Sequence, residues 1–224
     1  MTLRSSGFWS LTLGFFLLMQ GNQTPIPADP EQNTLSFSNQ IQAVGAVDDT
    51  SGKVSISVFE TTDCSECHAF ALNSVVEMEQ LYRHNPAVEL NVYLLPGNRS
   101  DEEKELEKEM LNNLTCLDQQ DQFWPIYYEF HAKEQLLNSS EIEELILSNE
   151  FEVDLDQLKT CLAENDLEKT LEANRNKAAV KQIEIYPSTL IQEVQFIHHQ
   201  PLENLVRVVN EKAMEINKAE LQTQ

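Results

Sequence analysis

Apolar and polar positions follow regular patterns along most of the chain, and the spacing differs between segments. Val54 to Phe59 is rich in β-branched residues and follows Ser51-Gly52, which predicts a core strand. From Cys67 to Tyr82, apolar residues recur every three or four positions, as they do on the buried face of a helix. Val88 to Leu95 predicts a second strand, closed by Pro96-Gly97. This part of the chain therefore predicts a β-α-β unit.

Helical spacing dominates the next part of the chain, residues 98–184. Asp154 and Asp166 are the expected N-caps of two helices in this part. The aromatic run Phe123 to Phe130 could line a substrate groove, but packing of the helices onto the core is the favoured interpretation.

Strand patterns return near the C-terminus. Ser188 to Ile191 and Val194 to His198 predict two short strands joined by a hairpin at Gln192-Glu193. Pro201 marks the start of a last amphipathic helix. An additional edge strand is expected within Leu35 to Val47. The predicted order is β-α-β, a helical insert, then β-β-α.

The N-terminus has the pattern of an export signal. Arg4 supplies a positive charge, and the apolar stretch Phe8 to Met19 is too short to span a bilayer comfortably. No A-x-A cleavage site is visible, so a cleaved signal peptide and an uncleaved signal anchor both stay open. Membrane contact is expected only through such an anchor.

The composition limits the choice of partners. The 224 residues include 15 Lys and Arg against 37 Asp and Glu, a formal net charge of -22. This charge repels phosphate backbones and anionic lipid surfaces, so no nucleic-acid partner is expected. A solubilising surface is the favoured interpretation of the acidity itself.

Cys64 and Cys67 form a C-x-x-C between the first predicted strand and the first predicted helix. Two thiols at this spacing can form a redox pair, stay a static disulfide or supply half of a zinc site. The junction favours redox chemistry, because N–H groups and the helix dipole at a helix N-terminus stabilise a thiolate. No second C-x-x-C and no H-x-x-x-H completes a zinc site, so no metal is expected. No phosphate loop or glycine-rich cofactor fingerprint appears either, so no organic cofactor is expected.

Three motifs in order resemble those of a known family. The first predicted strand leads into Phe-Glu-Thr-Thr-Asp-Cys-Ser-Glu-Cys-His-Ala-Phe, the insert contains Gln122-Phe123-Trp124-Pro125, and Ile185-Tyr186-Pro187-Ser188-Thr189 enters the third strand. From Val54 to the C-terminal helix, the chain resembles the DsbA-like family of extracytoplasmic thiol-disulfide oxidoreductases. The resemblance implies an α/β thioredoxin fold (β-α-β, β-β-α) interrupted by an inserted helical domain.

The resemblance also assigns roles to individual residues. Cys64 is the attacking sulfur, and Cys67, turned toward the core, resolves the mixed disulfide. Pro187 matches the cis-proline that faces the cysteines in thioredoxin-like proteins, and the Tyr186 backbone would pair with an extended substrate peptide. Spacing alone leaves an ordinary trans-proline open.

Cys116 and Cys161 lie in the helical insert, where some relatives in the family carry an additional disulfide. The resemblance implies a structural bridge between them. Closing a loop of about 46 residues would contribute about 4 kcal/mol on the chain-entropy model. A second redox relay with Cys64 and Cys67 is the functional alternative.

The surroundings of Cys64 depart from the pattern of strongly oxidising relatives, which tend to have Pro followed by an aromatic residue or His where this chain has Ser65-Glu66. Three carboxylates would crowd the nucleophile: Glu60, Asp63 and Glu66. Negative neighbours disfavour a thiolate, so we expect a less acidic Cys64 and a less oxidising couple. For His68, a tuning role and a solvated first-turn side chain are both open.

The predicted organisation has five segments. They are a signal peptide or anchor (1–21), an N-terminal linker that can contain the edge strand (22–50), the N-terminal part of the thioredoxin fold (51–97), the helical insert (98–184) and the C-terminal part of the fold (185–224).

The predicted function is that of an exported enzyme, periplasmic or secreted. It would exchange disulfides with extracytoplasmic protein thiols through Cys64 and Cys67 and would depend on a redox partner protein. The direction of electron flow stays open. The alternative is a non-catalytic thioredoxin-fold binding or assembly protein with a fixed disulfide.

Overall fold

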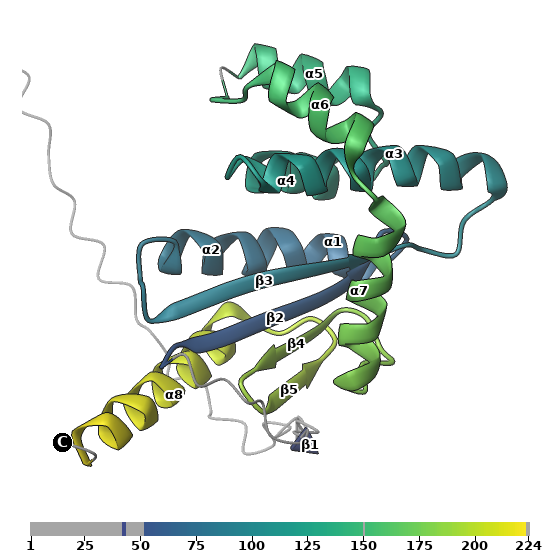
Figure 1. Ribbon diagram of the computed structural model, residues 1–224. Helices are drawn as coiled ribbons and strands as arrows, with labels where there is room; N and C mark the ends of the chain where they lie inside the picture. Colours follow the sequence, from purple (N-terminus) through teal and green to yellow (C-terminus); the bar gives the residue numbers. More distant parts are fainter. Residues whose placement is uncertain (1–41, 44–51, 150, 223–224) are drawn as a thin grey trace, which may run out of the picture. The chain divides into compact units, whose positions relative to one another are not determined.

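The structure is a computed structural model that describes residues 42–43, 52–149 and 151–222 (Figure 1). Its strands are β1 (Gln42–Ala43), β2 (Val54–Thr61), β3 (Val88–Leu95), β4 (Ser188–Ile191) and β5 (Val194–Ile197). Its helices are α1 (Ser65–Phe70), α2 (Val76–Tyr82), α3 (Asp101–Asp118), α4 (Phe123–Lys133), α5 (Ser139–Ser148), α6 (Leu155–Glu164), α7 (Leu167–Val180) and α8 (Leu202–Gln222). A π-helical segment, η1 (Ala71–Val75), joins α1 to α2.

The strands form one sheet in the order β1-β5-β4-β2-β3. β2 is parallel to β3 and antiparallel to β4, and β5 is antiparallel to both β4 and β1. With a neighbour on each side and helices over both faces, β2 is buried almost throughout. This burial explains why its sequence is nearly a continuous apolar run.

Side chains of β2 point alternately to the two faces of the sheet. Ile56 and Val58 belong to the main core, which includes residues of α2 and α8. Phe59 points the other way and packs with Leu95 and with Ala178 of α7 in a second, smaller cluster. The alternation places Glu60 on the same face as Ile56 and Val58, toward the main core.

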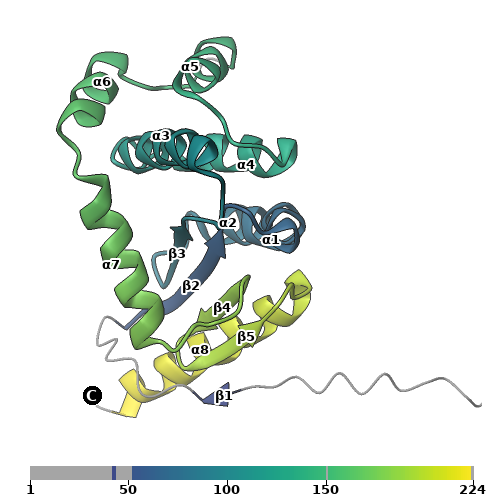
Figure 2. The same ribbon diagram turned by 90° about the vertical axis from the view of Figure 1, so that its right-hand side faces the viewer.

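Helices α3 to α6 form a stack on the far side of α1 and α2 from the sheet (Figures 1 and 2). Both views show α3 and α4 next to α1 and α2, with α5 and α6 outermost. Tyr127 and Phe130 of α4 are fully buried, as packing onto the core requires, whereas Phe123 and Trp124 are only half-buried. The aromatic run therefore has a core part and a part that is open to solvent.

The predicted order of elements is confirmed, with small shifts at the ends. β3 has the predicted bounds, whereas β2 continues to Thr61 and the first helix already begins at Ser65. Side chains of Asp154 and Asp166 cap α6 and α7 as predicted. An edge strand was expected within Leu35 to Val47, and β1 lies in this range.

Segment 1–21, with the expected export signal, lies outside the described residues. Among the residues that the structure describes, no helix is long and apolar enough to cross a membrane.

Candidate functional site

The C-x-x-C lies at the N-terminus of α1. Cys64 is the N-cap residue, and its Sγ accepts a hydrogen bond from the Cys67 N–H at 3.0 Å. The two sulfurs form a disulfide with Cα atoms 5.1 Å apart. Cys64 is half-buried, whereas Cys67 has no exposed surface. A partner can therefore reach one sulfur of the pair and not the other.

The Tyr186–Pro187 peptide bond is cis, which is the geometry that the resemblance implied. Phe59 of β2 pairs with Ser188 at the start of β4, so Pro187 lies beside the segment that leads from β2 to Cys64. The Pro187 carbonyl accepts a hydrogen bond from the His198 N–H at 2.8 Å. The cis-proline segment is thereby joined to the loop that follows β5.

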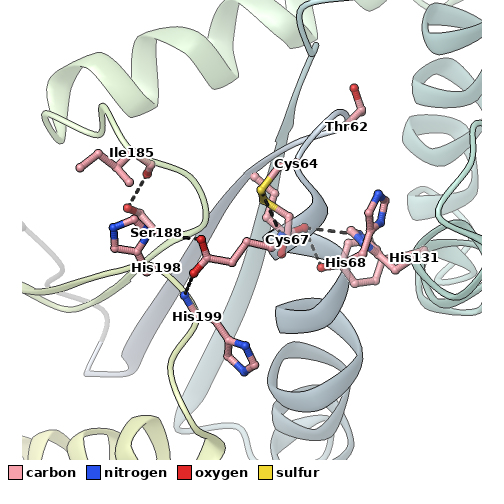
Figure 3. The surroundings of a disulfide bond; sticks show 12 residues. Thr62, Cys64, Cys67, His68, His131, Ile185, Ser188, His198 and His199 are labelled. Atoms are coloured by element: carbon pink, nitrogen blue, oxygen red, sulfur yellow. Dashed lines mark hydrogen bonds and ion pairs between the residues drawn. A yellow bond between two sulfur atoms is a disulfide. The ribbon is translucent and has the colours of Figure 1, made fainter. Parts of the chain in front are cut away.

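Glu66 connects the C-x-x-C to that same loop. One of its carboxylate oxygens accepts a hydrogen bond from the His199 N–H at 2.8 Å, and the other lies 3.3 Å from His198 Nδ1. Figure 3 shows His198 and His199 on one side of the disulfide. Glu66 was predicted to crowd Cys64, but its charge is directed toward this loop.

A buried polar cluster lies on the other side of the disulfide, where Figure 3 shows His68 and His131. Glu60 Oε2 accepts a hydrogen bond from the Tyr127 hydroxyl at 2.8 Å and lies 3.4 Å from His131 Nε2. His131 Nδ1 in turn lies 3.0 Å from His68 Nδ1. The exposed fraction of Glu60 and of His131 is 0%. Glu60 thus belongs to the interior, away from the solvent around Cys64.

Burial shifts the pKa of two members of this cluster, His68 and Tyr127. It lowers the pKa of His68, and the neighbouring His131 lowers it further, against the weaker effects of Glu134 and Glu60. Burial also raises the pKa of Tyr127 well above its usual value, and the negative charge of Glu60 adds to this. The first helix turn therefore presents a neutral His68, packed against Phe130, with ring centroids 5.2 Å apart. A solvated His68 side chain, one of the two readings left open, is ruled out.

A second polar cluster ties the active-site turn to α3. Glu107 of α3 is 2% exposed and accepts hydrogen bonds from the Thr62 hydroxyl and, at 2.9 Å, from the Gly97 N–H. Arg99 Nε lies 3.3 Å from the same carboxylate, and its guanidinium donates to the Thr62 carbonyl. These contacts join the start of the insert to the turn that carries Cys64.

Asp63 belongs to the same turn. Burial raises its pKa, but the Asn98 N–H at 2.7 Å, other hydrogen bonds and the Arg99 charge outweigh this, so the net pKa is lowered. A side chain at Gly97 would collide with Asp63, because an added Cβ would lie 2.4 Å from its carboxyl carbon. Asp63, like Glu66, has a backbone N–H donor of its own.

The structure joins Cys116 of α3 to Cys161 of α6 by a disulfide with Cα atoms 5.8 Å apart. Cys116 is fully buried and Cys161 is half-buried. Within the described ranges, no group of His, Cys, Asp and Glu is arranged to hold a metal ion.

Several residues of the site were not singled out by the sequence pattern. They are His131, Arg99 and Glu107, whereas Tyr127 was noted only as part of the aromatic run. The one usable signal was the alternation of β2, which continues into Glu60 and predicts a carboxylate on the buried face. Its partners come from α4, 67 residues further along the chain, and no local pattern connects the two segments.

A C-x-x-C at a helix N-terminus, next to a β2–β4 ladder that begins after a cis-proline, defines the thioredoxin-fold class of thiol-disulfide proteins. The family model described as Thioredoxin matches residues 46–211. The chain therefore belongs to the thioredoxin family.

Solved structures with the same fold support this assignment. The thiol-disulfide exchange protein alpha-DsbA2 from Wolbachia pipientis is 14% identical, with 74% of this chain and 84% of that chain covered and a TM-score of 0.55. ScsC from Proteus mirabilis is 18% identical, with 76% and 71% covered and a TM-score of 0.53. A thioredoxin-like oxidoreductase from Silicibacter pomeroyi DSS-3 is 13% identical, with 78% and 91% covered and a TM-score of 0.54. No curated protein sequence matches this chain.

Proposed function

We propose that the protein is an exported oxidoreductase that exchanges disulfides with extracytoplasmic protein thiols. A redox role through thiol-disulfide exchange follows from the family and from the Cys64–Cys67 disulfide. The observation that carries the proposal is the place of a half-buried Cys64 at the N-terminus of α1, bonded to a fully buried Cys67. Export rests on the apolar N-terminal sequence alone.

The exchange proceeds through a mixed disulfide. A substrate thiolate attacks Cys64 Sγ, the Cys64–Cys67 bond breaks, and Cys67 leaves as a thiolate. A second thiolate of the substrate then attacks the substrate sulfur of the mixed disulfide and releases Cys64. The substrate gains a disulfide and loses two electrons, which the cysteine pair takes up. The reverse sequence reduces a substrate disulfide.

The residues around the pair have distinct proposed roles. The Cys67 N–H and the start of α1 stabilise the Cys64 thiolate. The backbone at Tyr186 and Pro187 pairs with an extended substrate segment next to Cys64.

Four side chains tune the pair by charge and by packing. They are Glu60, Asp63, Glu66 and His68. The Cys116–Cys161 disulfide is proposed as a structural bridge within the insert.

Two assays with one variant test the enzyme against the binding protein. Reduction of insulin and refolding of a protein with scrambled disulfides are measured for the native chain and for Cys64→Ser. We expect activity in at least one assay and its loss in the variant. The Cys116→Ser/Cys161→Ser double variant is the matched control and keeps the activity. If the native protein is folded but inactive in each of the two assays, it is instead a binding protein with a fixed disulfide.

A further inference from the structure

The outer edge of β3 carries backbone groups that no neighbouring strand uses. In the described part of the sheet, β3 pairs with β2 alone. In such a pair, the N–H and C=O of alternate residues point to the partner, and those of the residues between point away. The Leu95 carbonyl accepts from the Thr62 N–H, next to β2. Leu94 therefore faces outward, and its carbonyl indeed accepts from Asn174 Nδ2 of α7 at 3.1 Å.

The same alternation turns Val88, Leu90 and Val92 outward. The Val88 N–H is used locally, since it donates to the Asn85 carbonyl at 3.1 Å. Asn174 closes the other end of the edge at Leu94. Between these two ends, the outward N–H and C=O of Leu90 and Val92 have no hydrogen-bond partner among the described residues. Unpaired N–H and C=O groups on two alternate residues of an edge strand are a template to which an extended chain can hydrogen-bond as an added strand.

A groove gives an extended chain access to this edge. One cavity of about 280 Å³ is lined by β3 from Leu90 to Leu94, together with residues of α3, α4 and α7. A second cavity of about 780 Å³ continues past the Val88 end. Leu90, Asp118, Phe123 and Trp124 line both cavities, so the two cavities adjoin along the strand and are together called the groove.

The groove is acidic and partly aromatic. Its lining includes one arginine, Arg83, and four carboxylates, which are Glu79, Glu89, Asp118 and Asp121. Arg83 is already paired with Glu79 at 2.5 Å. Burial raises the pKa of Asp118, and the negative charge of Asp121 raises it further. A cation placed here would favour the charged carboxylates of Asp118 and Asp121, and the rings of Phe123 and Trp124 provide faces that attract cations and alkyl chains.

We propose that this groove, lined by Leu90, Val92, Asp118, Phe123 and Trp124, binds an extended, cationic polypeptide segment as a strand added to β3. The segment pairs with the outward backbone groups of Leu90 and Val92. Its Lys or Arg side chains lie against Asp118 and Asp121. This site does not use the cysteines, so it goes beyond the disulfide exchange proposed above and provides a second contact for a polypeptide.

Peptide binding to the full chain tests the proposal. The probe is a fluorescein-labelled ten-residue peptide of alternating Lys and Val, compared with a Glu-Val peptide and with a Lys-Val peptide interrupted by two prolines. We expect only the first to bind with a Kd below about 1 mM in moderate salt. The amide signals of Leu90 and Val92 should shift most in the ¹H–¹⁵N spectrum.

Three variants separate this groove from general attraction to an acidic protein. Asp118→Lys should weaken binding about tenfold or more. Glu143→Lys, the same charge change on the exposed face of α5, should alter it less than about twofold. Leu90→Pro removes an outward N–H and leaves the ladder with β2 intact, so it should abolish binding in a chain with an unchanged circular dichroism spectrum.

Three results would overturn the proposal. The first is equal binding of the proline-interrupted peptide, and the second is an equal effect of Asp118→Lys and Glu143→Lys. The third is a shift of the Leu90 and Val92 signals with protein concentration alone, which would mean that the edge pairs with a second copy of the chain. If Leu90→Pro unfolds the protein, the test rests on the peptide affinities of Asp118→Lys and Glu143→Lys, compared with each other.

Discussion

The two disulfides of this chain are the same covalent bond in different surroundings. Cys64–Cys67 spans three positions at a helix N-terminus, and Cys64 is accessible. Cys116–Cys161 spans 45 positions and joins α3 to α6. It too has one fully buried and one half-buried cysteine, but neither of them lies at a helix N-terminus. Exchange needs a sulfur that a thiolate can approach and a leaving sulfur that is stabilised as an anion. A cross-link needs neither, and its contribution grows with the length of the loop that it closes.

The polar surroundings follow the same division. Around Cys64 and Cys67, polar side chains from four separate segments meet: β2, the start of α3, α4 and the loop after β5. This arrangement holds a reactive turn in position, because polar groups on both sides of the turn have partners on separate elements. Environment, more than the bond itself, separates a reactive disulfide from a structural one.

The largest expected effect concerns the bridge of the insert. Cys116→Ser/Cys161→Ser should lower the free energy of unfolding by up to about 4 kcal/mol, against about 2 kcal/mol for Cys64→Ser/Cys67→Ser. Urea denaturation under non-reducing conditions measures both. Mapping the disulfides by mass spectrometry under mild reductant should show that Cys64–Cys67 opens first. If both bonds open together, the two pairs act as a relay and the contrast between them is lost.

The next effect concerns the connection between the insert and the active-site turn. Glu107→Ala removes the acceptor of the buried Thr62 hydroxyl and one of the acceptors of Arg99 and of the Gly97 N–H, so it should lower the free energy of unfolding by about 2 kcal/mol. The matched control is Glu105→Ala on the same helix, which removes only an exposed ion pair and should change stability by less than about 0.5 kcal/mol. Equal effects of the two variants would contradict this role of Glu107.

The buried histidines predict a pH dependence. The pKa of His68 is lower in the folded protein than the ordinary value of 6.5, so the unfolded chain binds the proton more readily. The stabilising contribution is complete above pH 6.5 and is lost as the pH falls through 6.5 toward the lower folded value. His68→Phe should therefore flatten the fall of the unfolding free energy on the acid side of pH 6.5. His84→Phe, at an exposed position, is the control and should leave the slope unchanged.

The smallest effect is expected at Glu66. Glu66→Gln keeps an acceptor for the His199 N–H but removes the charge that faces His198. Both partners of that pair are largely exposed, so the change is worth at most about 1 kcal/mol, or about 20 mV in the reduction potential. The couple should become slightly more oxidising when equilibrated with glutathione. An equal shift in Glu143→Gln, far along the chain, would show that net charge rather than position is responsible.

The order of elements and the reactive motif could be predicted because local patterns encode them. The strand period of Val54 to Phe59 and the helical period that follows reflect burial along a single element, and both predictions are confirmed. The hairpin at Gln192-Glu193 and the caps Asp154 and Asp166 follow equally local rules. The proline at 187 was matched by its place in the family pattern, and its bond is cis.

The electrostatics of the site were less predictable. Three carboxylates close to Cys64 in sequence suggested a crowd of negative charge. In the fold they point in three directions: Glu60 into the core, Asp63 to the Asn98 N–H, and Glu66 to His199. The less acidic Cys64 derived from that crowding is still a prediction, and titration of the thiolate absorbance is the measurement that tests it.

The sequence by itself determined the class of fold, the place of Cys64 and Cys67 at a strand-to-helix junction, and the chemistry that such a junction favours. Only the tertiary structure decided which residues surround the pair and where the free edge of β3 meets an acidic groove. The physical reason is the sequence separation over which the interactions act. Periodicity and caps depend on neighbours within a turn or two, whereas contacts such as Glu66 with His199, 133 positions apart, depend on how whole elements pack.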